Sequence, residues 1–114
     1  VYKRQPLNDR TRGLIGAPEL SVMKRSALLI NVARGGIVDE AALAEALDRG
    51  SIAGAALDVF SREPFAADSP LLGIREPDRL LLSPHNAWSP VEAIEILVEC
   101  IARNIRDFYT PQNQ

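Results

Sequence analysis

The apolar residues follow two alternating patterns along the chain. Short, continuously apolar runs are typical of parallel strands covered on both faces, and they occupy residues 27–31, 54–59 and 80–83. Apolar residues at helical spacing occupy residues 18–23, 39–49 and 89–108, and residues 9–15 suit a further helical turn. Residues 61–76 are rich in Pro, Asp and Gly and are predicted to be irregular. This order predicts an α/β fold, a parallel sheet with helices on its faces.

Residues with known end preferences mark the boundaries of the two shorter helices. Pro18 is well tolerated in a first helical turn. Asp39 and Glu40 suit the positive end of the next helix dipole, and Arg49 with Gly50 suits its end. Small residues at 54–56 predict that a helix approaches the second strand closely.

The last helix has the clearest predicted start. Ser89 would cap it, Pro90 would take the first helical position, and Glu92 would complete a capping box with Ser89. Pro111 marks its end. Its apolar stripe comprises Val91, Ile94, Leu97, Val98, Ile101, Ile105 and Phe108.

Composition and net charge argue against several classes of binding partner for this chain. The 114 residues suit one small domain, and a net charge of −2 without a basic cluster argues against nucleic acid or an anionic membrane surface as the main partner. The longest apolar run is too short to cross a membrane. Cys100 is the only cysteine, so no internal disulfide is expected, which fits a reducing compartment such as the cytoplasm.

The first five residues, VYKRQ, read unlike the rest of the chain. One frame of a common sequencing-library adapter encodes the same five residues. We therefore interpret residues 1–5 as a library scar and exclude them from the fold. The alternative is a natural, charged N-terminal strand.

One ionisable residue lies in each of three loops that follow the predicted strands. The loops are residues 32–36, 60–64 and 84–88, and they carry Arg34, Glu63 and His85. Ligands of parallel sheets bind at the carboxyl ends of the strands. We therefore expect these three side chains to converge on one site.

Each of these side chains has a chemical and a plain structural interpretation. Gly35 and Gly36 would let the backbone turn sharply and come near a ligand. Arg34 beside them could grip a carboxylate through two parallel hydrogen bonds, or could be an ordinary surface arginine. Glu63 could orient a neighbouring base or simply be solvated. Asp58 ends an apolar strand and therefore needs a partner, either a cofactor amide or a neighbouring loop.

His85 is the only histidine and follows a proline in a loop, so it is the natural candidate for general acid–base chemistry. A nearby Glu63 would hold the ring and stabilise its protonated form. One His and one Cys far apart make no metal-ligand cluster, so no metal site is expected. No G-x-S-x-G motif is present, which argues against a serine hydrolase.

Four stretches carry a resemblance to a known family. They are PLNDRTRGLIG at 6–16, MKRSALLINVARGGIVDE at 23–40, GAALDVF at 54–60 followed by Glu63-Pro64, and SPHNAW at 83–88. Together they resemble the D-isomer specific 2-hydroxyacid dehydrogenases in order and spacing. The resemblance implies that residues 6–114 form the C-terminal part of the NAD(P)-binding domain, the second half of a Rossmann-type parallel sheet with flanking helices, plus a long C-terminal helix.

The resemblance also implies roles for individual residues. His85 would exchange a proton with the substrate, Glu63 would tune His85, and Arg34 would hold the substrate carboxylate. The NAD or NADP cofactor would contact a second set, namely Pro6, Val32, Ala33, Arg34, Asp58, His85 and Ala87. The parent would be a homodimer acting on a small 2-keto or 2-hydroxy acid. Within the family, Glu63 favours such an acid over formate as the substrate. Trp88 would be a further substrate contact and favours hydroxypyruvate or glyoxylate. Trp88 could equally be an interface or lid residue.

Departures from the family pattern leave alternatives open. Asn8 replaces a threonine, and Arg25-Ser26 replaces a Pro-Gly turn. No G-x-G-x-x-G motif is present, so this chain alone is expected to lack turnover, and its terminal helix is expected to expose its apolar stripe. The competing hypotheses are a nucleotide-sensing corepressor-like binding module and a dehydrogenase of another oxyanion such as phosphite.

Overall fold

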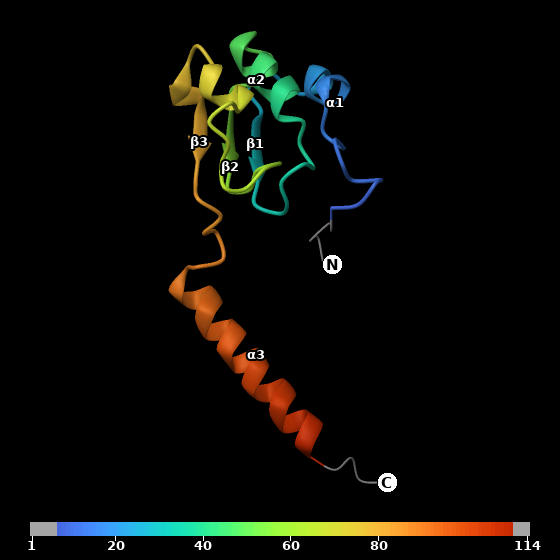
Figure 1. Cartoon of the computed structure of the whole chain (residues 1–114), viewed down its shortest axis with the longest axis vertical. Coiled ribbons are helices and arrows are strands. Elements are labelled where there is room, and N and C mark those ends of the chain that lie inside the picture. Colours follow the sequence, from blue (N-terminus) through green and yellow to red (C-terminus); the bar gives the residue numbers. More distant parts are fainter. Residues whose placement is uncertain (1–6, 111–114) are drawn as a thin grey trace.

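A computed structural model describes residues 7–110, and Pro6 and the interpreted scar lie outside this range. The three strands β1 (Leu28–Asn31), β2 (Gly54–Leu57) and β3 (Leu80–Leu82) form one parallel sheet in the order β1-β2-β3 (Figure 1). The α-helices are α1 (Ala17–Val22), α2 (Glu40–Asp48) and α3 (Val91–Tyr109). The predicted α/β architecture is confirmed, although β2 ends at Leu57, two residues before the predicted end of that strand.

The core lies on one face of the sheet, beneath α2. Leu43, Ala46 and Leu47 of α2 are buried, together with Leu57 of β2. The Asp39 carboxylate accepts the N–H groups of Ala41 and Ala42, which confirms the acidic start of α2. These contacts fix α2 against the sheet and leave the loops at the strand ends open to solvent.

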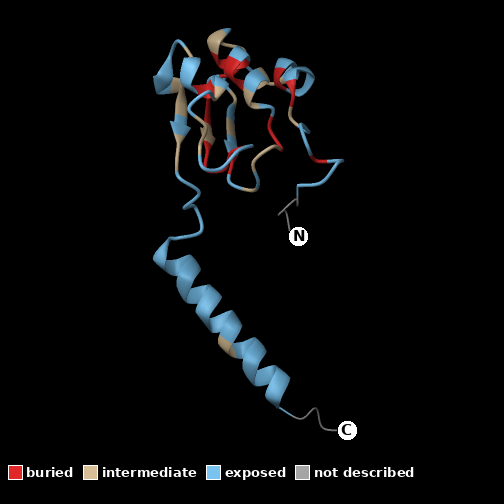
Figure 2. Cartoon of the chain, in the orientation of Figure 1, coloured by how far each residue is buried: buried red, intermediate tan, exposed pale blue. Residues whose placement is uncertain are grey.

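The opposite face of the sheet is open in the described residues, contrary to the prediction of strands covered on both sides. Leu28 and Ile30 of β1 are 68% and 67% exposed, and Leu81 of β3 is also exposed. The burial map shows the buried positions gathered toward α1 and α2 (Figure 2). The prediction was wrong because an apolar run shows only that both faces suit burial, not that a neighbour covers both.

Three glycines permit a close approach of neighbouring backbone or a sharp turn. A Cβ on Gly35 would lie 1.7 Å from the Phe60 carbonyl oxygen, so Gly35 permits the approach of another loop rather than of a ligand. A Cβ on Gly54 would lie 2.9 Å from the carbonyl oxygen of Arg79, so the close neighbour of β2 there is the last residue of a 3₁₀ helix rather than part of an α-helix. Gly36 does support the predicted sharp turn, with φ of 79°.

The segment predicted to be irregular contains a short 3₁₀ helix, η1 (Pro70–Gly73), and η2 (Pro77–Arg79) follows it. The Ser69 side chain accepts the N–H of Leu71 at the start of η1, and Leu71 is buried in the core. Proline, which starts both 3₁₀ helices, suits a first turn as well as a loop, so composition alone did not separate the two.

The terminal helix α3 projects away from the sheet, and the described chain extends 62 Å along its longest axis (Figure 1). Its apolar stripe is exposed, as expected. The predicted capping box is wrong. Pro90 is the N-cap, and the Ser89 hydroxyl donates instead to the Asn86 carbonyl at 2.7 Å. Across residues 7–110, no helix combines the length and the apolar character needed to cross a membrane.

Candidate active site

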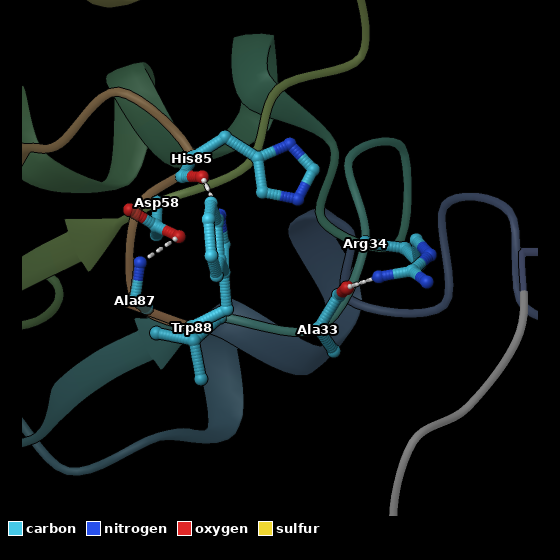
Figure 3. A pocket seen from close by; sticks show the side chains of 7 residues that line it. Ala33, Arg34, Asp58, His85, Ala87 and Trp88 are labelled. Carbon is cyan, nitrogen blue, oxygen red and sulfur yellow. Dashed lines mark hydrogen bonds between the residues drawn. The ribbon is translucent and has the colours of Figure 1, made fainter. Parts of the chain in front are cut away.

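Residues that follow each of the three strands line one pocket of about 370 Å³. Arg34 and His85 line this pocket as expected, whereas Glu63 does not line it and reaches the site through its contact with His85. The residues that line it are Val32, Ala33, Arg34, Asp58, His85, Ala87 and Trp88. Figure 3 shows the His85 ring and the Arg34 side chain on one side of the view and Asp58 and Ala87 on the other.

Asp58 organises the loop that carries His85. It is only 2% exposed. One carboxylate oxygen accepts the Ser83 hydroxyl at 2.6 Å and the Asn86 N–H at 2.9 Å, and the other accepts the Ala87 N–H at 2.9 Å. Burial raises the pKa of Asp58, but the hydrogen bonds from Ser83, Ala87 and Asn86 outweigh burial and leave this pKa below the ordinary value of 3.8. Asp58 therefore stays ionised and ties the loop to the end of β2.

Glu63 and His85 form the predicted pair. The His85 Nδ1 atom lies 2.8 Å from Glu63 Oε2, and the Phe60 N–H donates to Glu63 Oε1 at 3.1 Å. An ionised carboxylate only accepts hydrogen bonds, so Nδ1 is the donor and Nε2 is the ring nitrogen left for other partners. The hydrogen bonds from His85 and then from Phe60 lower the pKa of Glu63 below its ordinary value of 4.5. Glu63 is thus a charged anchor for the ring.

Arg34 lies on the β1 side of the pocket in an exposed position. Its Nη1 donates to the Ala33 carbonyl at 2.7 Å. Asn31 fixes the turn before it, because the Asn31 side chain accepts the Ala33 N–H at 3.1 Å and donates to the Arg34 carbonyl at 3.0 Å. This bond engages one of the five guanidinium N–H groups and leaves four for other partners.

Trp88 lines the pocket on the His85 loop. Its indole N–H donates to the His85 carbonyl at 3.0 Å, and its side chain remains largely exposed (Figure 3). The predicted site residues from Val32 to Trp88 are therefore brought together. Pro6 lies outside the described residues, so its expected place near the adenosine end of a cofactor stays a prediction.

Sequence reasoning missed Ser83 and Asn31 as supporting residues. The register gives the signal that identifies Ser83, because Leu57 pairs with Leu82 and the next residues of the two strands are therefore neighbours. A buried carboxylate at 58 needs a donor, and Ser83 is the donor in that position. Within residues 7–110, no three His, Cys, Asp or Glu side chains gather as metal ligands do.

Several known proteins are similar to this chain. The glycerate dehydrogenase of Methylorubrum extorquens is 46% identical over 110 residues, which cover 95% of this chain and 35% of that protein. The glyoxylate reductase of Korarchaeum cryptofilum is 43% identical over 103 residues, covering 90% of this chain and 30% of that protein. The chain thus spans about a third of the length of these curated relatives.

Solved structures match the fold as well. The NADPH-dependent glyoxylate/hydroxypyruvate reductase of Sinorhizobium meliloti, in complex with NADP and malonate, superposes with a TM-score of 0.71 at 36% identity, over 94% of this chain and 32% of that chain. A D-isomer specific 2-hydroxyacid dehydrogenase of Xanthobacter autotrophicus, in complex with NADPH and MES, gives 0.66 at 45% identity, over 90% and 42%.

The family model described as "D-isomer specific 2-hydroxyacid dehydrogenase, NAD binding domain" matches residues 1–87. This range covers the sheet, α1, α2 and the loops that carry Arg34, Glu63 and His85. On the pocket geometry and this match, the chain belongs to the D-isomer specific 2-hydroxyacid dehydrogenase family.

Proposed function

We propose that this chain is the C-terminal part of the NAD(P)-binding domain of an enzyme that transfers a hydride between NADH or NADPH and a small 2-keto or 2-hydroxy acid. The observation that carries the proposal is the 2.8 Å contact between His85 and Glu63 at a pocket shared with Arg34. The relatives include a glyoxylate reductase and a glyoxylate/hydroxypyruvate reductase, which favours glyoxylate or hydroxypyruvate as the substrate.

His85 is the proton carrier in this proposal. Reduction of a 2-keto acid adds a hydride to the carbonyl carbon and a proton to its oxygen. The protonated Nε2 of His85 supplies that proton, and in the reverse direction the neutral Nε2 accepts it from the hydroxyl. Glu63 holds Nδ1, which leaves Nε2 as the ring nitrogen available to the substrate. Its negative charge also stabilises the protonated ring before the proton leaves.

Arg34 supplies the group that recognises the acid. A guanidinium has five N–H donors in a planar fork, and Arg34 uses one nitrogen on the Ala33 carbonyl in the described residues. A turn of the side chain offers the fork to a carboxylate through two parallel hydrogen bonds. The same cation near the keto oxygen withdraws electron density from the carbonyl carbon, which favours hydride addition.

The pocket wall suits the nicotinamide end of the cofactor. One Asp58 oxygen accepts only the Ala87 N–H among the described residues, so it retains a lone pair for an amide N–H. Val32 and Ala33 form another wall. When bound, NADH or NADPH supplies the hydride. Asp58, Val32, Ala33 and Ala87 would hold it near His85.

We also propose that the parent protein is a homodimer in a reducing compartment such as the cytoplasm. The exposed apolar stripe of α3 and the free, exposed thiol of Cys100 support this proposal. Light scattering of the purified parent checks the first part, because a monomer at micromolar concentration contradicts it. Cell fractionation checks the second, and recovery of the protein outside the cytoplasm contradicts it.

A substrate screen tests the proposed function. The protein expressed from the complete gene is incubated with NADH or NADPH and with glyoxylate, hydroxypyruvate or pyruvate, and with NAD or NADP and with phosphite or formate. We expect cofactor oxidation with at least one keto acid. Turnover confined to phosphite or formate, or no turnover with any compound, contradicts the proposal. An inactive protein that still binds NADH favours the corepressor-like alternative.

A further inference from the structure

His85 has a backbone conformation that L-amino acids rarely adopt. Its φ is 53°, and it is the one non-glycine residue with positive φ in the part of the chain that the structure describes. Steric contact between the side chain and the backbone disfavours this region for any residue with a Cβ. The surrounding contacts therefore have to hold His85 in place.

Hydrogen bonds fix the two peptide planes that define this conformation. The His85 N–H donates to the Ser83 carbonyl at 3.0 Å, which holds the plane before His85. The plane after it is held at both ends. Its N–H, from Asn86, donates to Asp58 at 2.9 Å, and its carbonyl, from His85, accepts the Trp88 indole N–H at 3.0 Å. Without Trp88 the second plane is held at one end only.

The position of the Trp88 ring supports a specific role for its N–H group. The side chain is not buried in the core, because Trp88 is 61% exposed. Packing alone therefore does not account for its orientation. The hydrogen bond to His85 is the polar contact that the structure gives the indole, and it closes a short ring of residues within the catalytic loop.

We propose that Trp88 is a positioning residue, whose indole N–H holds the His85 carbonyl and thereby keeps the imidazole directed at Glu63. The importance of this role for catalysis rests on the proposed function, because the orientation of the imidazole affects turnover only if His85 transfers a proton. Loss of the indole N–H frees the carbonyl, allows the second peptide plane to rotate, and lets His85 relax to negative φ. The ring then leaves Glu63.

The chain is well suited to an NMR test, because His85 and Trp88 are its only histidine and its only tryptophan. The first measurement is the exchange of the Trp88 indole N–H with deuterium in the unmodified chain. We expect exchange at least about tenfold slower than in free tryptophan, because the donor is engaged. Exchange of the indole N–H as fast as in free tryptophan overturns the proposal. This measurement uses the unmodified chain and therefore does not depend on whether a variant folds.

The second measurement follows the side-chain carboxyl carbon of Glu63 through a pH titration in Trp88→Phe, which keeps an aromatic ring and removes the donor. We expect the pKa of Glu63 to rise, by most of the rise produced by His85→Ala. Tyr109→Phe, which removes a polar group from an exposed aromatic residue on α3, is the matched control and should leave this pKa unchanged. Methyl signals of Leu43 and Leu57 report whether the core is intact.

An unchanged Glu63 titration in Trp88→Phe, with the core signals intact, overturns the proposal. Neither measurement contains substrate or cofactor. Failure of the Trp88 proposal is therefore distinguishable from failure of the proposed function, which the substrate screen of the complete protein decides on its own.

Discussion

The Nδ1 atom of His85 lies 2.8 Å from the Oε2 atom of Glu63, and 22 positions along the chain separate the two residues. The second oxygen of Glu63 accepts the Phe60 N–H, so the carboxylate is held from both sides. This arrangement leaves Nε2 as the ring nitrogen that faces other partners. General acid–base catalysis uses a histidine that a carboxylate holds in this way.

Replacement of His85 should alter the titration of Glu63. The hydrogen bond from His85 is the largest cause of the lowered pKa of Glu63, and the bond from Phe60 is the next. In His85→Ala we therefore expect this pKa to rise toward its ordinary value of 4.5 while remaining somewhat below it. The measurement is the carboxyl carbon shift of Glu63 between pH 2 and pH 7. A Glu63 titration identical to that of the unmodified chain would show that the pair does not form in solution.

Stability should fall with acid because two carboxyl groups have lowered pKa values in the folded state. In the folded state the pKa of Asp58 lies below its ordinary value of 3.8, and the pKa of Glu63 lies below its ordinary value of 4.5. Each ionised carboxylate therefore stabilises the fold fully at a pH above its ordinary pKa. This stabilisation is lost as the pH falls through the folded pKa values. Urea denaturation between pH 7 and pH 2.5 should show a falling midpoint. In Asp58→Asn the urea midpoint should depend less on pH. Asp68→Asn, at an exposed position, should leave this pH dependence unchanged.

Gly35 should tolerate no side chain. A Cβ there would lie 1.7 Å from the Phe60 carbonyl oxygen, and backbone has to move to relieve the contact. We expect Gly35→Ala to lower the free energy of unfolding by about 1–3 kcal/mol or more, the usual cost of overpacking. The matched control is Gly73→Ala, where nothing lies within 4 Å of the added carbon. Equal stability of both variants in urea denaturation would refute the close contact.

This chain alone should show no dehydrogenase turnover. It has no G-x-G-x-x-G motif, and that glycine-rich turn is what lets a backbone approach the pyrophosphate of a dinucleotide. The check is oxidation of NADH and of NADPH by the purified 114-residue chain with glyoxylate and with hydroxypyruvate. Robust oxidation would mean that the described pocket binds the cofactor without such a motif.

Much of the site could be predicted from sequence because parallel strands end at one edge of a sheet. The three apolar runs located β1, β2 and β3, and the loops after them brought Arg34, Asp58 and His85 to one pocket. The pairing of Glu63 with His85 followed from their place in neighbouring loops and from the family resemblance.

The rest depends on geometry that residue types do not encode. The bond between Trp88 and His85 occurs together with a positive φ at His85, and no local sequence pattern indicates either feature. The capping box failed because the Ser89 hydroxyl has a nearer acceptor in the Asn86 carbonyl. The open sheet face could not be predicted, because the apolar runs do not say which neighbours are present.

The role of His85 as the proton carrier is tested by the turnover of His85→Ala in the complete protein. We expect kcat with the best keto acid to fall by about 10²–10⁴-fold, the usual contribution of a positioned acid–base group. The dissociation constant for NADH or NADPH, measured by fluorescence, should change far less. Arg62→Gln, at an exposed arginine outside the pocket, is the control and should keep normal turnover. A His85→Ala protein that loses cofactor binding but turns over normally at saturating cofactor would show that His85 is not the proton carrier.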